Sequence, residues 1–375
     1  MKGKAGRIAV LALGLVAIVA RHACEWRQDR RAGLRLLAVR ETPPPPLRRT
    51  PRVSILVAAW NEAAYILPHL QSVQALTYPD LEYILCAGGA DGTYDLAKRH
   101  MGEGMVLLQQ QPGEGKQGAL RRCLRGATGE IVFLTDADTV LDAQTFSRTL
   151  APVLNEDEAV AGGVARPMAP DRAAFPLVTF LYGRESYLAA GTWAHRPTLL
   201  GRNAAVRRDA LEAAGRFDAD AWTGTDYRLG RDLKRHGFRV RFIPESAVAT
   251  VYHSDPLRYA RYRSRCMRTA FRHGVPTGDW RGVWDALSAV LAGLVVLTAP
   301  IVLLRGRFFL SAAWAWMLAF ALCRDVRQAA LGALLTGRKP GVRFFAWVPA
   351  WLLLDSLIWA STPLQLLPRR LRDLW

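Results

Sequence analysis

The sequence predicts an α/β fold, with a parallel sheet flanked by helices, joined to membrane-associated segments at both ends of the chain. Two observations support this prediction. Short apolar, partly β-branched runs alternate with helical patterns between residues 53 and 134, and three apolar runs follow residue 283. Alternating strands and helices favour a parallel sheet, because each helix returns the chain to the edge from which the next strand starts.

The expected elements follow one another in this order: strand 53–58, helix 66–73, strand 81–85, helix 93–101, strand 105–109, helix 116–126 and strand 131–134. Ligands of such sheets bind beyond the carboxyl ends of the strands. Two polar clusters fall at predicted strand ends, Trp60-Asn61-Glu62 and Asp136-Ala137-Asp138. We therefore expect both clusters to belong to one site.

The charge distribution favours a membrane surface over nucleic acid. The chain carries 50 Lys and Arg against 32 Asp and Glu, a formal net charge of +18. The basic residues concentrate at 21–52, 258–272 and 324–343, beside apolar segments, as on the cytoplasmic flank of membrane helices. Zinc-finger spacing and an aromatic RNA-binding signature are absent from the sequence, so nucleic acid is not an expected partner.

The cysteines indicate a reducing environment. Five of them lie far apart, at positions 24, 86, 123, 266 and 323, and no C-x-x-C occurs. This spacing argues against a disulfide framework and a structural zinc site, and suits a domain facing the cytosol.

The N-terminal apolar run, Ile8 to Ala20, is shorter than the ~20 residues of a spanning helix. A short anchor, an interfacial helix and a signal peptide remain as interpretations, although the Arg-rich residues 21–52 oppose export. The prolines at 43–46 form a stiff spacer that marks a boundary. We expect an anchor and linker at 1–50, a central domain at 51–275 and a membrane region at 276–375.

Three apolar runs in the C-terminal region, 286–304, 308–323 and 344–367, predict membrane insertion. The second run is slightly short, and the third contains Asp355 and several prolines. The number of crossings stays open, including the alternative that one run is re-entrant or lies in the interface. The basic residues at 324–343 suit the cytoplasmic side.

Asp136 and Asp138 follow the predicted strand 131–134 and could share one divalent cation. Carboxylate oxygens suit Mg²⁺ or Mn²⁺, which bridge diphosphate oxygens. A D-x-D triplet also occurs as an ordinary solvated turn. The loop Gly113 to Gly118 carries Lys116 at the start of a helix and could approach a diphosphate; the alternative is a flexible surface loop. Asp226 could be a general base, and the structural alternative is a helix N-cap at Thr225 or Asp226.

Together these segments resemble the motifs of family-two glycosyltransferases over roughly residues 51–275. The matching segments occur in the family's order: 53–62, 77–82, 90–93, 115–120, 135–138, 201–208, 215–218, 225–226 and 237–240. The ordered set is more specific than any single member.

The resemblance implies a nucleotide-diphospho-sugar transferase fold (GT-A-like), with one mixed sheet and a metal at Asp136-Ala137-Asp138. It places Asn61, Glu62, Asp91 and Lys116 at the nucleotide-sugar. Asp136 would face the ribose or the metal, and Asp138 would ligate the metal. Asp226 would be the base of a single inverting displacement.

Three departures from the family pattern qualify these expectations. Cys86-Ala87-Gly88-Gly89 stands where the family usually has Asp-Asp-Gly-Ser, which puts uridine specificity in doubt. Thr225-Asp226 replaces the usual Glu-Asp pair. The stretch 262–268 lacks the Gln and Trp of the processive members' Gln-x-x-Arg-Trp motif.

We therefore expect a metal-dependent transferase that moves a sugar from a nucleotide-diphospho-sugar to a lipid or saccharide acceptor. It would be a multi-pass protein of the cell membrane with a cytoplasmic catalytic domain. A processive polysaccharide synthase and a catalytically idle membrane scaffold are the alternatives. Two further hypotheses are His253 as a third metal ligand, or else a loop histidine, and Trp222 as a stacking platform for the acceptor.

Overall fold

The computed structural model describes residues 2–168, 175–189, 194–196, 199–217, 224–252, 255–305 and 308–366. Contacts divide the chain into two compact units. One comprises residues 36–168 and 191–251 and contains the sheet; the other comprises 1–35, 169–190 and 252–375 and is helical. This division differs from the three consecutive segments expected from the sequence, whose boundaries stay a prediction.

The described part of the sheet unit contains one sheet of nine strands. Their order is β3 (Met105–Gln109), β2 (Leu81–Gly88), β1 (Val53–Trp60), β4 (Ile131–Thr135), β8 (Asn203–Arg207), β6 (Val160–Pro167), β9 (Val240–Thr250) and β5 (Thr139–Val140), with β7 (His195–Arg196) pairing with β9. The first four are mutually parallel, as the alternating pattern predicts, and β8 runs antiparallel to β4 and β6. The sheet is therefore mixed, as the family resemblance implies.

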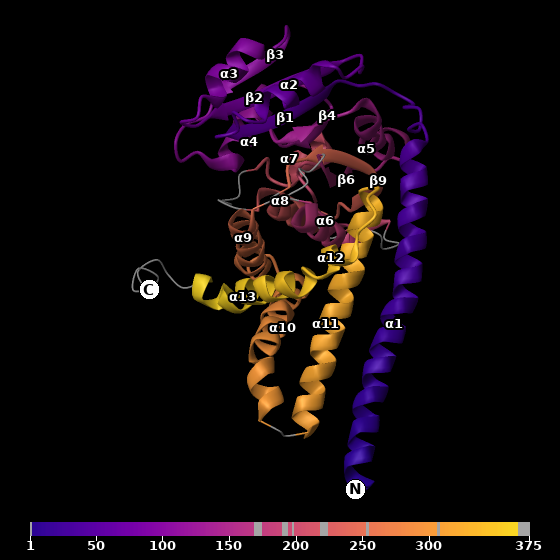
Figure 1. Cartoon of the computed structure of the whole chain (residues 1–375). Helices are drawn as coiled ribbons and strands as arrows, with labels where there is room; N and C mark the ends of the chain where they lie inside the picture. Colours follow the sequence, from indigo (N-terminus) through magenta and orange to yellow (C-terminus); the bar gives the residue numbers. More distant parts are fainter. Residues whose placement is uncertain are drawn as a thin grey trace. The chain divides into compact units, whose positions relative to one another are not determined.

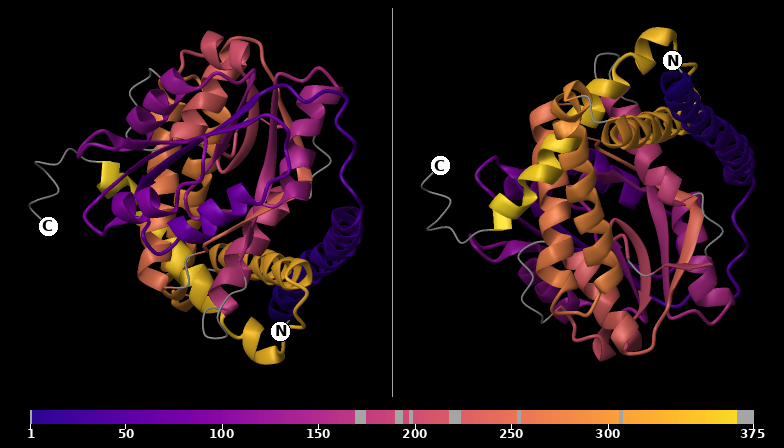
Figure 2. Two further views of the ribbon diagram at one scale, coloured as in Figure 1. Left: turned by 90° about the horizontal axis from the view of Figure 1, so that it is seen from above. Right: turned by 90° about the horizontal axis from the view of Figure 1, so that it is seen from below.

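Helices cover both faces of this sheet (Figures 1 and 2). They are α2 (Ile66–Gln74), α3 (Thr93–His100), α4 (Gly115–Gly126), α5 (Ala143–Asn155), α7 (Arg208–Ala213) and α8 (Thr225–Arg235). Side chains of α4, α7 and α8 share one apolar core with alternate residues of the strands, such as Leu56 and Ile84. On the other face Phe133 of β4 packs on Phe146 of α5, with ring centroids 4.8 Å apart. Alternation along each strand supplies both cores.

The order of the strands reverses at β1. The chain moves from β1 to β2 and β3 on one side, and then returns to place β4 on the other side of β1. Val53 pairs with Leu81 of β2 and with Ile131 of β4. At such a switch point the loops after adjacent strands diverge and leave room for a ligand at the carboxyl ends. The ends of β1 and β4 carry Asn61-Glu62 and Asp136-Ala137-Asp138.

The helical unit contains the segments predicted to meet the membrane. Its helices are α1 (Lys2–Glu41, which continues into the sheet unit), α6 (Phe175–Ala189), α9 (Pro256–Gly274), α10 (Trp280–Leu304), α11 (Phe308–Leu335), α12 (Val342–Phe345) and α13 (Val348–Leu366). Among the residues that the structure describes, four stretches are long and apolar enough to cross a membrane: Lys4–Glu41, Trp280–Leu304, Phe308–Leu335 and Val342–Leu366.

The N-terminal apolar run is longer as a helix than the sequence suggested. It does not end near Ala20 but continues through the Arg-rich residues to Glu41. Arg, Glu, Leu and Ala are good helix formers, and the prolines from Pro43 prevent further helix. A 40-residue helix replaces the short isolated segment expected from the sequence.

Small residues bring helices of this unit close together. Gly183 of α6 faces the Gln328 carbonyl of α11, and Gly332 faces the Thr179 carbonyl, so neither position has room for a side chain. A Cβ at Gly293 of α10 would lie 2.7 Å from the Ser356 carbonyl of α13. The last helix runs across α10 rather than along it (Figure 1).

Candidate active site

Four carboxylates converge at the carboxyl ends of β1, β2 and β4. Burial, together with the neighbouring charges of Asp138, Asp136 and Asp91, raises the pKa of Glu62 to about 7, against the opposing effect of Lys116. Burial disfavours the charged form of a carboxyl group, and nearby negative charges add to that effect. The structure therefore brings together Glu62, Asp91, Asp136 and Asp138, which the sequence assigned to one site.

Asp138 is held by the last residues of β9. The Thr250 hydroxyl donates to Asp138 Oδ1 at 3.4 Å and to its carbonyl at 3.3 Å, and the Val251 N–H donates to the same carbonyl at 3.2 Å. Burial and the adjacent Asp136 raise the pKa of Asp138. A divalent cation would relieve this excess of negative charge.

The two aspartates supply hard oxygen ligands, but not a complete cage. Among the residues that the structure describes, no three His, Cys, Asp or Glu side chains are grouped so as to hold a metal ion. A magnesium-type ion is often held by one or two carboxylates and completed by water and substrate phosphates. Asp136 and Asp138 therefore fit a divalent cation whose remaining ligands are water and the oxygens of a bound diphosphate.

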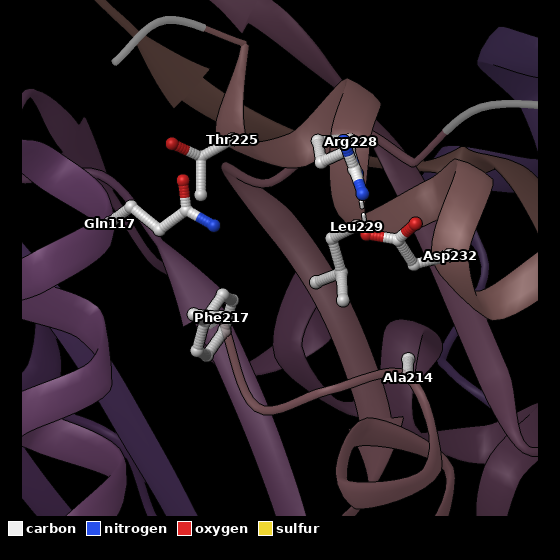
Figure 3. A pocket seen from close by; sticks show the side chains of 7 residues that line it. All are labelled: Gln117, Ala214, Phe217, Thr225, Arg228, Leu229 and Asp232. Carbon is white, nitrogen blue, oxygen red and sulfur yellow. Dashed lines mark hydrogen bonds and ion pairs between the residues drawn. The ribbon is translucent and has the colours of Figure 1, made fainter. Parts of the chain in front are cut away.

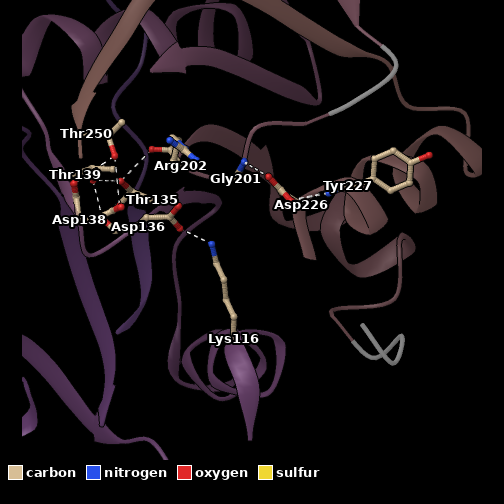
Figure 4. A network of polar contacts seen from close by, with 10 residues as sticks. All are labelled: Lys116, Thr135, Asp136, Asp138, Thr139, Gly201, Arg202, Asp226, Tyr227 and Thr250. Atoms are coloured by element: carbon tan, nitrogen blue, oxygen red, sulfur yellow. Dashed lines mark hydrogen bonds and ion pairs between the residues drawn. The ribbon is translucent and has the colours of Figure 1, made fainter. Parts of the chain in front are cut away.

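Lys116 connects the aspartates to the opposite side of the site. Its ammonium group forms an ion pair with Asp136, and it lies in the first turn of α4, after Gly115 with φ +68° (Figure 4). Burial would lower the pKa of Lys116, but Asp136 and then Asp226 outweigh it, so the pKa is raised. Lys116 therefore stays charged. Its ammonium group interacts electrostatically with both Asp136, the predicted metal ligand, and Asp226, the predicted base.

Asp226 lies inside the first turn of α8 and is not its N-cap. The N-cap is Gly224, with φ +72° and no side-chain cap, so the alternative that Thr225 or Asp226 caps the helix is wrong. The Tyr227 N–H donates to Asp226 Oδ1 at 2.9 Å, and the Gly201 N–H donates to Oδ2 at 3.4 Å (Figure 4). A Cβ at position 201 would lie 2.9 Å from the Asp226 Cβ, so only glycine fits there without movement.

Asn61 and Asp91 tie the loops after β1 and β2 to each other. Asn61 adopts φ +58°, and its Oδ1 accepts from the Ala90 N–H at 2.8 Å. Asp91 accepts from the Ala63 N–H at 2.9 Å and from the Thr93 N–H at 3.0 Å. Burial acts against ionisation of Asp91, but these hydrogen bonds, with that from the Thr93 hydroxyl, lower its pKa. Both residues shape the site; direct contact with a nucleotide-sugar stays a prediction.

Two further residues belong to the site although the sequence gave them no role. Arg202 lowers the pKa of both Lys116 and Asp138, so its positive charge lies among the acidic groups. Arg202 follows Gly201 inside a segment that matches the family, and this position in the sequence could have indicated that it belongs to the site. Thr250 is 112 residues from Asp138 in sequence, and no sequence pattern pairs them.

A buried polar network supports the floor of the site. The Asn203 amide, fully buried in β8, donates to the Ser246 carbonyl at 3.2 Å and to the Ser246 hydroxyl at 3.1 Å. Asn203 Oδ1 accepts from the Thr149 hydroxyl at 2.9 Å. These bonds join β8, β9 and α5 beneath the loop that carries Arg202.

The Thr225 side chain lines a small cavity. The cavity is lined by Gln117, Ala214, Phe217, Thr225, Arg228, Leu229 and Asp232 (Figure 3). Its volume is about 10 Å³, the space of roughly one water molecule. The threonine that replaces the family's usual glutamate therefore contributes to packing between α4 and α8.

Cys86 and Ala87, which stand where the family usually has two aspartates, lie in the interior of the sheet unit. Both residues are fully buried in β2, and Cys86 packs with Cys123 of α4 in the core. That the nucleobase lacks an acidic contact at this strand end stays a prediction. His253 and Trp222, the hypothetical metal ligand and stacking platform, lie outside the described residues, as does Asp218.

A mixed sheet with a carboxylate cluster and a lysine at its switch point defines a glycosyltransferase of the nucleotide-sugar type. Residues 51–271 match the family model described as glycosyltransferase like family 2, and the chain belongs to that family. It is an enzyme of the glycosyltransferase class, as the sequence predicted.

Named relatives agree with this assignment. The chain is 26% identical over 225 residues to the probable glycosyltransferase YdaM of Bacillus subtilis, covering 56% of this chain and 52% of that protein. It is 26% identical over 278 residues to the β-monoglucosyldiacylglycerol synthase of Trichormus variabilis, covering 67% and 57%. The chain thus spans little more than half the length of these relatives.

One solved structure resembles the whole fold. The mannosyltransferase PcManGT of Pyrobaculum calidifontis, in complex with GDP-Man and Mn²⁺, superposes with a TM-score of 0.51. The match has 21% sequence identity and covers 95% of this chain and 100% of that one. This similarity confirms the fold.

Proposed function

We propose that this enzyme transfers a sugar from a nucleotide-diphospho-sugar to a lipid or lipid-linked acceptor, with inversion at the anomeric carbon. The observation that carries the proposal is the position of Lys116, whose charge is coupled to Asp136 on one side and to Asp226 on the other. A diphosphate held near Lys116 would place the reacting sugar between the metal ligands and the base.

The donor end would be formed by Asp136, Asp138, Lys116 and Arg202. Mg²⁺ or Mn²⁺ bound at the aspartates would neutralise charge on the leaving diphosphate. Mn²⁺ accompanies GDP-Man in the structurally similar mannosyltransferase, which supports this assignment. Lys116 and Arg202 would add positive charge beside the same oxygens.

The acceptor end would be formed by Asp226. Its carboxylate would take the proton from the acceptor hydroxyl as the hydroxyl oxygen attacks the anomeric carbon, while the bond to the diphosphate breaks on the opposite face. A single displacement of this kind inverts the anomeric configuration. The Gly201 and Tyr227 N–H groups donate to the two carboxylate oxygens and fix the orientation of the side chain.

A lipid acceptor agrees with the helical unit. Four candidate membrane spans accompany the catalytic sheet, and a relative is named for synthesis of a glucosylated diacylglycerol. We propose a multi-pass protein of the cell membrane with its catalytic unit on the cytoplasmic side, where nucleotide-sugars occur. The crossing of α13 over α10 (Figure 1) supports the alternative that α13 lies in the interface.

A processive polysaccharide synthase is the second candidate, because a 95-residue stretch is 35% identical to a poly-β-1,6-N-acetyl-D-glucosamine synthase of Staphylococcus epidermidis. That stretch covers 24% of this chain. The missing Gln and Trp in residues 262–268 weigh against processive synthesis.

The test uses purified full-length protein in detergent with Mg²⁺ or Mn²⁺, a panel of nucleotide-sugars and diacylglycerol or polyprenyl phosphate as acceptor. Release of nucleoside diphosphate and the mass of the lipid product are followed. Asp138→Ala should abolish metal-dependent donor binding. Asp226→Asn should bind donor normally but transfer at least 100-fold more slowly.

Asp95→Asn, at an exposed position of α3, is the matched control and should behave as wild type. Equal loss of donor binding in Asp226→Asn would contradict its role as base. Wild-type protein that neither binds nor turns over any donor would favour the idle scaffold. Products longer than one added sugar would favour the synthase.

A further inference from the structure

A row of arginines runs along one face of α9 (Pro256–Gly274). These residues, called the α9 arginine stripe below, are Arg258, Arg261, Arg265, Arg268 and Arg272. Their spacing of three and four residues keeps all five on one side of the helix. Four of them are exposed and Arg268 is half-buried.

Other side chains of α9 fix the helix inside the helical unit. The Tyr259 hydroxyl donates to Asp355 of α13 at 2.7 Å, and the Tyr262 hydroxyl donates to Glu185 of α6 at 2.9 Å. Arg263 approaches the same Asp355 at 3.7 Å. These buried contacts determine which side of α9 faces outward, so the stripe cannot turn inward without breaking them.

The stripe is not neutralised by its surroundings. In the described part of the chain, no Asp or Glu side chain forms an ion pair with any of its five arginines. The nearby carboxylates have other partners: Asp255 caps α9 through the Leu257 and Arg258 N–H groups, and Asp279 caps α10. Five like charges on one face repel each other, and an anionic surface would offset that cost.

Exposed apolar side chains occur at the start of α9 and, after its end, at the start of α10, and they indicate what that surface is. Trp280 and Trp284 begin the candidate span α10, lie on one face four residues apart, and are 66% and 63% exposed. Leu257, at the other end of α9, is 58% exposed. Tryptophans gather where a membrane helix meets the headgroups, and arginines reach headgroup phosphates from the same depth.

We propose that the α9 arginine stripe is a docking surface for anionic phospholipid headgroups of the bilayer. It would hold α9 at the membrane surface beside the point where α10 enters the bilayer. The stripe faces away from the Tyr259 and Asp355 contacts and uses none of the residues assigned to donor binding or to the base, so the proposal stands independently of the proposed reaction.

The test uses full-length protein in a neutral detergent with equal amounts of phosphatidylglycerol and phosphatidylcholine, and native mass spectrometry of the retained lipid. Wild type should retain phosphatidylglycerol preferentially, and added salt should weaken the preference. Because each arginine near an anionic surface contributes about 1 kcal/mol, the triple variant Arg258→Gln, Arg261→Gln, Arg265→Gln should lose on the order of 100-fold in that preference.

The matched control removes the same charge from the sheet unit. Lys98, Arg99 and Arg125 are exposed and have no assigned role, so their triple glutamine variant should keep the preference. If the α9 triple variant does not fold, Arg261→Gln alone should lower the preference about fivefold.

Three outcomes would overturn the proposal. Wild type could show no preference for phosphatidylglycerol, or the α9 variants could keep the preference of wild type. Glycerol phosphate at equal concentration could displace the lipid, which would indicate a site for a small phosphate and not for the bilayer. Donor binding, measured in parallel, separates these outcomes from a failure of the proposed reaction.

Discussion

Substituting Gly201 by alanine tests whether the position of Asp226 matters for transfer. The alanine Cβ would lie 2.9 Å from the Asp226 Cβ and 3.8 Å from its Cγ. Carbon atoms without a bond between them prefer a separation of roughly 3.5–4.0 Å. Asp226 must therefore retreat by about 0.5–1 Å, and the weak bond from the Gly201 N–H to its Oδ2, 3.4 Å long, is lost or distorted.

A displacement of about 1 Å at a reacting group can cost on the order of 100-fold in rate. We expect kcat of Gly201→Ala to fall 10- to 100-fold, while the dissociation constant for the nucleotide-sugar stays within about twofold, because Asp136 and Asp138 are untouched. The assay is steady-state transfer to lipid acceptor, with donor binding by calorimetry on the same preparations.

Gly126→Ala is the matched control. A Cβ there would meet only the Ile84 Cδ1, at an ordinary 3.9 Å, and should leave kcat unchanged. The reasoning fails if Gly201→Ala transfers at the wild-type rate, or if donor binding falls as much as kcat. The first result would mean that Asp226 tolerates movement, and the second that the whole site has shifted.

Two other predictions concern stability in detergent. Asn203→Leu removes the buried amide's bonds to the Ser246 carbonyl, the Ser246 hydroxyl and the Thr149 hydroxyl, and should lower the free energy of unfolding by about 3 kcal/mol; a thermal melt unchanged from wild type would contradict this. Burial lowers the pKa of His69 to about 4 from 6.5, so the unfolded state binds its proton first as pH falls. The neutral His69 thus contributes about 3 kcal/mol above pH 6.5, lost progressively between pH 6.5 and 4, and His69→Gln should flatten that part of the stability profile.

The sequence by itself determined the local structure of the first half of the sheet. β-branched runs and helical periodicity located the strands at 53, 81, 105 and 131 and the helices between them. They do so because the buried side of a strand or helix requires apolar residues at regular intervals in the sequence. It also predicted roles for Asp136, Asp138, Lys116 and Asp226, because their order along the chain matches a known family. The extent of α1 was missed, since a helix rich in arginine has no apolar signal beyond residue 20.

Only the tertiary structure decided how these groups meet. Sequence spacing does not show that Thr250 holds Asp138, that Gly201 must be small because Asp226 lies against it, or that Lys116 is coupled to Asp136 and Asp226 together. It also does not show that Asp355 fixes the inner side of α9. Each depends on pairings between strands or helices far apart in the chain, and those are set by packing and burial of the whole fold, which no local pattern encodes.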